Sequence, residues 1–412
     1  MAPLEPWEKV LVDGENYPQT VHGEISCVEC HDGDSNSTDK TAAHVGLIHN
    51  PSEDPVQACG DCHHDVVATH DNNLHNNLAG YWTVLDARSL PEDHEALEGA
   101  FTNHCADCHA TCGECHVSQP NYVGGGLIEG HEFNKTPSMT RNCTACHGSR
   151  VGNEYLGKNE GLRPDVHFTQ GRMSCVDCHS GHDMHGADED CQSCHPGPEG
   201  NEMPPPDHRY DGVQSPSCES CHVSASLGKD DIEMHGQHSG DLSCQVCHSV
   251  SYTSCDGCHV QISETTGNPF FATDASYMTF IIGKNPREGY QRPYEYVTLR
   301  HVPISPTSFD YYGEDLLALY DALPTWTYAT PHNIQRNTPQ TESCNACHGN
   351  ADIFLTLDKL YPEEVEANLS VIVETIPEPI YEITGTVDIT GTNTLTTPTI
   401  TSDDTSESDE SP

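Results

Sequence analysis

The sequence predicts a mostly irregular chain with short helices and few β-strands, without a large hydrophobic core of its own. Hydrophobic residues make up only 34% of the 412 residues, and that fraction includes 22 cysteines. So few apolar side chains fall short of an ordinary globular core at this length. The cysteines recur in pairs over most of the chain, so we expect the fold to be organised around those pairs.

Every cysteine belongs to a Cys-x-x-Cys pair that a histidine follows directly. The eleven motifs are Cys27-Cys30-His31, Cys59-Cys62-His63, Cys105-Cys108-His109, Cys112-Cys115-His116, Cys143-Cys146-His147, Cys175-Cys178-His179, Cys191-Cys194-His195, Cys218-Cys221-His222, Cys244-Cys247-His248, Cys255-Cys258-His259 and Cys344-Cys347-His348. In this pattern the two thiols can add to the two vinyl groups of one porphyrin, and the adjacent histidine binds the iron. The motifs therefore predict eleven covalently bound haem c groups, with the eleven motif histidines as proximal ligands.

Two other interpretations compete with haem attachment. An even number of cysteines is typical of a disulfide framework, and repeated Cys-x-x-Cys pairs are typical of structural zinc sites. Neither explains the histidine after each pair. With 28 histidines in 412 residues, chance would place one at such a position about one time in fifteen, which eleven occurrences in eleven motifs exclude.

Haem attachment would change how the chain folds. Eleven porphyrins would supply much of the buried apolar surface, and the chain would wrap round a row of haems as loops and short helices. The binding free energy of the cofactor would then be the folding free energy. We therefore expect the protein without haem to be disordered.

The sequence divides into four parts. Residues 1–26 form a polar N-terminal lead-in, and residues 27–259 form a haem-dense core with ten of the eleven motifs. Residues 260–360 are rich in aromatic residues and carry the eleventh haem. Residues 361–412 form a Thr-rich, acidic C-terminal tail.

The interval between His259 and Cys344 predicts a small α+β insertion between the tenth and eleventh haems. Tyr277–Ile282 and Tyr294–His301 have the β-branched and aromatic content of strands. Glu314–Leu323 has the pattern of a short helix.

The C-terminal tail has more than one interpretation. Its composition is typical of a solvated, disordered end. Alternatively, residues 380–390 form a strand that pairs with a neighbouring subunit, or the Thr-rich stretch forms a surface stalk. The sequence leaves these alternatives open.

Seventeen histidines remain outside the motifs, more than eleven irons require. This excess predicts that most irons are bis-histidine, with a second imidazole as the distal ligand. The candidate distal ligands are His22, His49, His70, His75, His104, His131, His167, His185, His208, His235, His238, His301 and His332. Methionine cannot be the general distal ligand, because the chain has only seven.

Local context ranks these candidates. The strongest lie shortly before a first cysteine or after the tenth motif: His22, His167, His185, His238, His301 and His332. His64 directly follows a proximal ligand and His94 lies in an acidic segment, so we expect neither to bind iron. Of the close pair His44 and His49, we retain His49.

The charge and the lack of long apolar runs limit the partners. A formal net charge of −47 excludes nucleic acid as a partner. No apolar stretch approaches the roughly 18 residues of a membrane-spanning helix, so we expect no transmembrane segment. Covalent haem attachment takes place outside the cytoplasm. We therefore expect a removed secretion signal and an extracellular or cell-surface location, with the periplasm as second choice.

Over residues 20–350 the motifs together resemble those of the multihaem c-type cytochromes of anaerobic bacteria and archaea. Residues 296–304 (YVTLRHVPI) and 328–336 (YATPHNIQR) are similar to segments of secreted multihaem cytochromes from metal-reducing and related organisms. The resemblance implies that His301 and His332 are axial ligands. It also implies exchange of electrons with redox partners such as other cytochromes and extracellular acceptors. Some members of this class polymerise into filaments (nanowires), which adds a homopolymer to the expected partners.

Two functions follow from these expectations. In the first, which we favour, the protein is an electron carrier rather than a catalyst, because every iron has two histidines available and close haems exchange electrons without substrate. In the second, the protein is an oxidoreductase that acts on a nitrogen or sulfur oxyanion at one haem with an open position. The aromatic segment near Tyr290, Arg292, Tyr294 and Arg300 would line that site.

Overall fold

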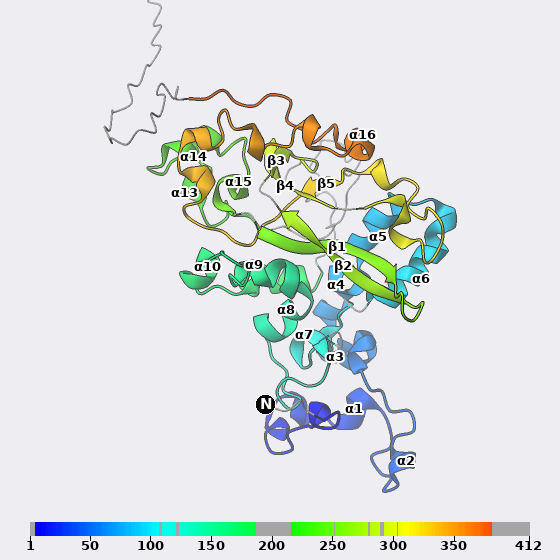
Figure 1. The fold of residues 1–412 in the computed structure, drawn as a ribbon. Coiled ribbons are helices and arrows are strands. Elements are labelled where there is room, and N and C mark those ends of the chain that lie inside the picture. The colour runs from blue at the N-terminus through cyan, green and yellow to red at the C-terminus, as the bar shows by residue number, and fades with distance from the viewer. Residues whose placement is uncertain are drawn as a thin grey trace, which may run out of the picture.

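The computed structural model of the chain describes residues 5–106, 109–120, 123–186, 216–250, 252–278, 281–288, 292–302 and 304–380. The described chain is elongated (Figure 1). Helices α1 (Cys27–His31) and α2 (Lys40–Ala43) lie at one end, and α14 (Glu233–His238) and α16 (Val365–Asn368) lie near the other. The strands lie between these ends.

The described ranges contain fifteen α-helices, all of them short. In addition to those named above they are α3 (Pro55–Val67), α4 (Leu74–Asn77), α5 (Ala79–Asp86), α6 (His94–His104), α7 (Cys112–His116), α8 (Thr144–His147), α9 (Asn153–Tyr155), α10 (Val166–Thr169), α11 (Gly181–Met184), α13 (Val223–Ser226) and α15 (Cys244–His248). Single turns of 3-10 helix and irregular chain join them. The prediction of a mostly irregular chain with short helices and few strands is confirmed.

Local sequence explains why the helices are short. Leu78 has a φ of 52°, a left-handed conformation that separates α4 from α5. Polar residues begin new helices by accepting hydrogen bonds from the first free backbone N–H groups. The Asn73 side chain does this for α4, and Thr111 with Glu114 forms a capping box at α7.

The strands form two antiparallel sheets. In the first, β1 (Tyr252–Ile262) pairs with β2 (Pro269–Met278). The second has the order β3-β4-β5, with β3 (Ile281–Lys284) and β5 (Trp326–Tyr328) on either side of β4 (Tyr296–His301). The strand predicted over residues 294–301 is confirmed as β4. The strand predicted over residues 277–282 is divided, because its two ends belong to different sheets.

The helix predicted over residues 314–323 is wrong. This segment consists of turns followed by a 3-10 turn at Tyr320–Ala322. Asp315 has a φ of 52°, which a right-handed α-helix cannot accommodate. Leu316 and Leu317 are instead both buried against Leu97 of α6.

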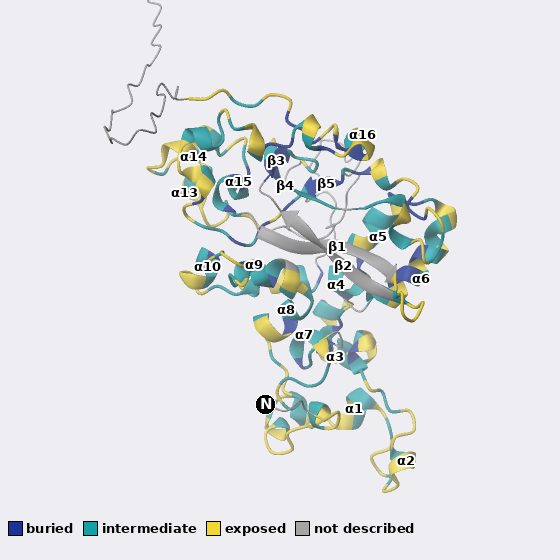
Figure 2. Ribbon diagram, viewed as in Figure 1, coloured by how far each residue is buried: buried dark blue, intermediate teal, exposed yellow. Residues whose placement is uncertain are grey.

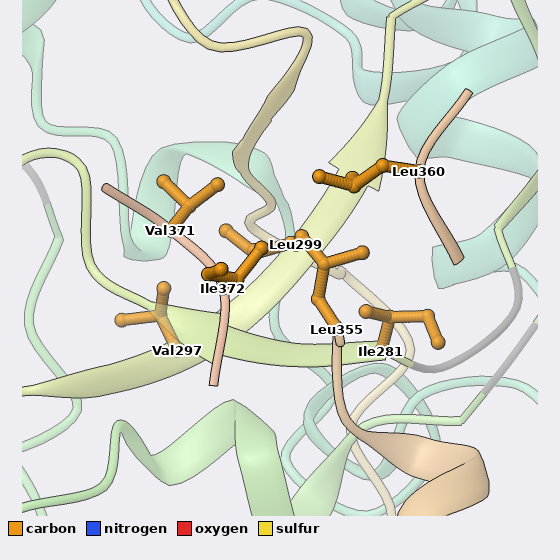
Figure 3. Close-up of a cluster of buried hydrophobic side chains, with 7 residues drawn as sticks. All are labelled: Ile281, Val297, Leu299, Leu355, Leu360, Val371 and Ile372. Atoms are coloured by element: carbon orange, nitrogen blue, oxygen red, sulfur yellow. The ribbon is translucent and has the colours of Figure 1, made fainter. Parts of the chain in front are cut away.

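A hydrophobic core surrounds the three-stranded sheet. It consists of Ile281, Val297, Leu299, Leu355, Leu360, Val371 and Ile372 (Figure 3). Val297 and Leu299 project from one face of β4, because side chains two apart on a strand point the same way. Leu355 joins the sheet through its backbone N–H, which donates to the Ile282 carbonyl at 2.8 Å. Residues 281–380 are therefore a conventionally packed unit, which we call the C-terminal region.

The helices that carry most of the motifs bury much less apolar surface. Figure 2 shows mostly intermediate and exposed residues along α1, α2, α3 and α7, with few buried ones. We call residues 27–250 the motif region. Its buried hydrophobic side chains, among the residues that the structure describes, are Leu78, Leu97, Ala100, Phe101, Val117 and Val246. Within the described ranges, no helix combines the length and apolar composition needed to cross a bilayer.

Candidate functional site

A tight turn gives most described motifs the same local shape. The backbone N–H groups of His179, His222 and His348 donate to the carbonyl of the first cysteine of their motifs, at 2.8–2.9 Å. Other motifs lie within or across short helices, including α1, α7 and α15. One helical turn places residues three and four apart on a single face. Both thiols and the imidazole can therefore reach the same porphyrin.

Three motifs differ from this pattern or lie partly outside the described residues. Residues 255–259 lie in β1, where the backbone is extended rather than turned. Residues 191–195 lie outside the described ranges, as does Cys108 of the third motif. We number the sites 1 to 11 in the order of their motifs, so these are sites 10, 7 and 3.

The structure brings eight motif histidines each against one non-motif histidine. The ring centroids are 6.0–6.3 Å apart in His31 with His131, His63 with His22, His116 with His185, His147 with His75, His179 with His332, His222 with His167, His248 with His235, and His348 with His238. These are sites 1, 2, 4, 5, 6, 8, 9 and 11. None of these pairs joins two motif histidines or two non-motif histidines.

The separation of the rings matches two imidazoles on one metal ion. A histidine nitrogen binds a metal at about 2.0 Å and lies about 1.2 Å from its ring centre, so two imidazoles on opposite sides of one metal ion would have centroids at most about 6.4 Å apart. Rings in direct van der Waals stacking would lie closer. The residues present therefore fit a group held between two axial imidazoles.

Several of the paired rings have a hydrogen-bond acceptor behind them. The Nδ1 atoms of four motif histidines donate to backbone carbonyls at 2.7–3.1 Å: His31 to Ile48, His116 to Asn134, His248 to Gln335 and His348 to Glu378. Because a carbonyl can only accept, Nδ1 carries the proton and Nε2 keeps a free lone pair. Metal-binding histidines are held in this way by a second hydrogen bond.

Carboxylates lie behind the Nδ1 atoms of three non-motif histidines, and two of them accept a hydrogen bond from that atom. His167 Nδ1 donates to Asp165 Oδ1 at 2.9 Å, and His235 Nδ1 donates to Asp230 Oδ2 at 2.6 Å. His332 Nδ1 lies 3.6 Å from a Glu154 carboxylate oxygen. These three acids are not among the site residues predicted from the sequence. Their closeness in sequence to His167 and His235 was a signal for two of them, whereas Glu154 is distant from His332.

Burial keeps many of these imidazoles neutral. It lowers the pKa of His22, His75, His131, His179, His185 and His248 below the usual value. Removing a charged imidazolium from water is unfavourable. The neutral form is also the one that binds a metal ion.

A cavity of about 3720 Å³ runs along the paired histidines. Its lining includes both histidines of all eight pairs, together with many motif cysteines and apolar side chains such as Val66, Leu85 and Val246. A pocket for one drug-sized ligand has about 300–1,000 Å³. This cavity can therefore hold several large cofactors in a connected row.

Sites 1, 2, 4 and 5 are neighbours in space. Burial, with the charges of Cys112 and Cys30, raises the pKa of Cys59 to about 11, so the thiols of sites 1, 2 and 4 lie near one another. Burial and the charge of Cys143 raise the pKa of Cys115 to about 11. Site 4 therefore adjoins site 5.

Direct thiol contacts link the next sites. The Cys143 thiol hydrogen-bonds to Cys175, which lowers the pKa of Cys143 and raises that of Cys175. Cys218 and Cys244 make the same contact, with the same opposite shifts in pKa. These contacts join site 5 to site 6 and site 8 to site 9.

Two further neighbours complete the series. Burial raises the pKa of Cys178, and the nearby charge of Cys221 contributes to that shift. Burial and the charge of Cys247 raise the pKa of Cys347 to about 11. The first contact joins site 6 to site 8 and the second joins site 9 to site 11. The eight sites follow the order 1, 2, 4, 5, 6, 8, 9, 11.

The third motif lies beside this series. Burial lowers the pKa of His70, and the charge of His109 contributes to that shift, so the two histidines are close. His185 of site 4 also lies near His70. His109 Nε2, however, contacts Asn76 Oδ1 at 3.0 Å and does not face another imidazole in the way of the eight pairs.

Other candidate distal ligands have different partners. His301 Nε2 lies 2.8 Å from Glu364, and His104 Nε2 lies 2.6 Å from the Tyr312 hydroxyl. His49 lines the cavity, and His208 lies outside the described residues. Their roles as iron ligands stay predictions, as do those of the paired histidines.

The two competing interpretations of the cysteines find no support in the described residues. The seventeen cysteines whose side chains are described are not joined in disulfides. Within the same ranges, no group of three or more His, Cys, Asp or Glu side chains is arranged to hold a metal ion directly. Paired imidazoles beside paired thiols are a donor set that a covalently attached haem could use.

Comparison with known proteins adds no relative. No protein-family model matches the chain, and neither a curated protein nor a solved structure matches it.

Proposed function

We propose that this chain is a multihaem c-type cytochrome, which holds eleven haem c groups and carries electrons along them. The observation that carries the proposal is the set of eight imidazole pairs at 6.0–6.3 Å. Each pair combines one motif histidine with one histidine from elsewhere. Eleven attachment motifs in the sequence support the same conclusion independently.

The residues of the chain have three roles in this proposal. The motif cysteines tether each haem and the paired imidazoles ligate the iron, which supplies one-electron redox chemistry. The backbone carbonyls and carboxylates behind the imidazoles fix the orientation of each ring. The apolar lining of the cavity keeps water from the porphyrin faces.

The order of the sites supports conduction over a distance. The series of eight sites begins at α1, passes α7 and α8, and ends near α14 and α15 (Figure 1). Neighbouring sites are close enough for their cysteines to contact or to influence one another's charge. Electrons would therefore enter near one end of the elongated molecule and leave near the other.

One observation favours a second candidate, an oxidoreductase acting on a nitrogen or sulfur oxyanion. The exposed His109 of site 3 faces Asn76 rather than a second imidazole. An iron there with an open position could bind a substrate. The aromatic segment offers another setting, because Arg292, Tyr294 and Arg300 line the cavity, whereas Tyr290 lies outside the described residues.

Electron paramagnetic resonance of the oxidised protein tests both candidates, once pyridine haemochrome analysis has counted the haems. We expect eleven haems for each chain, with low-spin ferric signals that account for them. A high-spin signal amounting to one haem in eleven would indicate an iron with an open position and would favour the oxidoreductase over the electron carrier. Absence of covalently bound haem would refute both.

The proposed setting is outside the cell or on its surface, with other cytochromes or extracellular acceptors as redox partners. Assembly into a filament is part of this proposal. Negative-stain microscopy of material sheared from cells tests it. Uniform thin fibres that contain the chain would support a filament, and dispersed particles alone would refute it.

A further inference from the structure

Three neighbouring sites share a feature that the others lack among the described residues. At sites 6, 8 and 9, the non-motif imidazole has a carboxylate behind its Nδ1 atom. The acids are Glu154 at His332, Asp165 at His167 and Asp230 at His235. Sites 6, 8 and 9 are consecutive in the series of eight.

The carboxylates at sites 6 and 8 are deeply buried. The side chains of Glu154 and Asp165 are each only 2% exposed, whereas that of Asp230 is 24% exposed. Each carboxyl group lies close to a paired imidazole, and at two of the sites solvent hardly screens it. A charge interacts more strongly across a protein interior than across water.

Three other sites have a neutral acceptor behind the motif imidazole. At sites 1, 4 and 11 the motif imidazole donates to the backbone carbonyl of Ile48, Asn134 or Glu378. Site 9 has both kinds of acceptor, since its motif imidazole donates to the Gln335 carbonyl. Sites 1, 4 and 11, each with a neutral acceptor, therefore lie on either side of the consecutive sites 6, 8 and 9, each with a carboxylate.

An anionic acceptor changes what an imidazole does to a metal ion. It attracts the Nδ1 proton, which makes the imidazole a stronger electron donor through Nε2. Stronger donation and a nearby negative charge both favour the ferric form over the ferrous form. The midpoint potential of such a site is lower than that of a site with a carbonyl acceptor.

We propose that sites 6, 8 and 9 form the section of lowest midpoint potential, and that Glu154, Asp165 and Asp230 are the positioning residues that set it. This inference rests on the proposed binding of haem. Partial reduction would then place electrons on the outer sites first. Sites 6, 8 and 9 would then be an energetic barrier that electrons cross on the way from one end of the series to the other.

Asp165 links two of these sites. One of its oxygens accepts from His167 of site 8, and the other accepts from the backbone N–H of Ile334 at 2.6 Å. Ile334 lies two residues from His332 of site 6. The Asp165 carboxylate therefore holds the ligand of one site directly and the segment that carries the ligand of the next.

Asp230→Asn on the haem-loaded full chain is the first test, because Asp230 is partly exposed and its loss leaves the buried network intact. In a spectroelectrochemical titration, about one eleventh of the absorbance change should move from the most negative potentials of the curve to higher potentials. At site 9 we expect the ratio of ferric to ferrous haem at a fixed potential to fall at least tenfold. For one electron this corresponds to a rise of about 59 mV in the midpoint potential. Asp231→Asn is the matched control, since Asp231 is exposed and adjacent.

The buried acids give a second test with a larger expected shift. Asp165→Asn and Glu154→Gln should each move part of the low-potential absorbance further than Asp230→Asn does, and Asp230→Glu should restore the native curve. Curves for Asp230→Asn and Asp165→Asn that superimpose on the native one would overturn the inference. The haem count and the low-spin signals would stay unchanged in that case, so failure of the inference is distinguishable from failure of the proposed function.

Discussion

The C-terminal region and the motif region are packed in different ways. The C-terminal region packs branched apolar side chains round a three-stranded sheet, with Val297, Leu355 and Val371 fully buried. Among its described residues the motif region has few buried apolar side chains, and a cavity of about 3720 Å³ runs along the paired histidines. Most of its histidines and cysteines are half-buried along that cavity.

The difference teaches where the stability of each region comes from. Side-chain burial suffices in the C-terminal region, at about 25 cal/mol for each Å² of apolar surface removed from water. In the motif region the same role falls to the cofactors of the proposed function. The two regions are nevertheless joined, because His332 and Asn333 of the C-terminal region contact Glu154 of α9.

Removal of haem should produce the largest difference between the two regions. If the chain binds haem as proposed, protein made without haem attachment should lose all measurable structure in the motif region, because the binding free energy of haem would supply its folding free energy. Amides of β4 should keep part of their protection, since their core needs no cofactor. Hydrogen exchange followed by mass spectrometry measures both regions at once. Protection of residues 27–250 at the native level would contradict this expectation.

Truncation of a core side chain should act on the C-terminal region alone. Leu355 is fully buried, so Leu355→Ala should reduce the free energy of unfolding by about 2–5 kcal/mol. Leu357→Ala is the control, because Leu357 is 53% exposed and should change it by less than about 0.5 kcal/mol. The denaturant midpoint of the haem-loaded protein, followed by circular dichroism, measures the difference. Equal losses in the two variants would show that this core is not what stabilises the region.

Asn333 tests the connection between the regions. Its buried amide nitrogen donates to the Glu154 carbonyl at 2.8 Å and to the Arg163 carbonyl at 2.6 Å. Asn333→Ala leaves both carbonyls without that donor and should cost about 1–3 kcal/mol. Hydrogen exchange of residues 153–169 should increase, whereas the exposed Asn337→Ala should leave it unchanged. No increase with Asn333→Ala would mean that the regions are joined by other contacts.

The smallest expected effect concerns a feature that both regions share. Hydrogen bonds from the Ser174 backbone and hydroxyl lower the pKa of Asp177, and a hydrogen bond from Thr356 lowers that of Asp358. A lowered pKa stabilises the fold above the ordinary value of 3.8, and this contribution is lost as the pH falls through the folded value. In a plot of melting temperature against pH, Asp177→Asn should therefore make the fall at acid pH slightly less steep than in the native protein. Identical acid limbs in the native protein and the variant would contradict it.

The eleven Cys-x-x-Cys-His motifs could be recognised from sequence because their pattern is local. Two thiols and an imidazole within five residues suffice to identify a site. Strand β4 was predicted for a similar reason, since its β-branched residues lie together at Tyr296–His301. The helix over residues 314–323 could not be excluded, because nothing local indicates that Asp315 adopts a left-handed conformation.

The pairing of the histidines could not be predicted, because it depends on the folded chain. His22 lies just before the first motif but faces His63 of the second. His185 lies just before the seventh motif but faces His116 of the fourth. Composition therefore identified the kind of residue, and only the three-dimensional arrangement identified its partner. The carboxylates behind the imidazoles were missed because acidic residues are common in this chain.

The long separation in sequence between paired histidines has a consequence for how the molecule matures. His179 faces His332, which is synthesised much later. Under the proposed function, a chain that ended at residue 250 would have one imidazole at site 6 and an accessible iron opposite it. Shortened or proteolysed forms of the haem-loaded chain should therefore bind carbon monoxide at site 6, whereas the full chain should not bind it at that site. Completion of the C-terminal region would thus close site 6 to small reactive ligands.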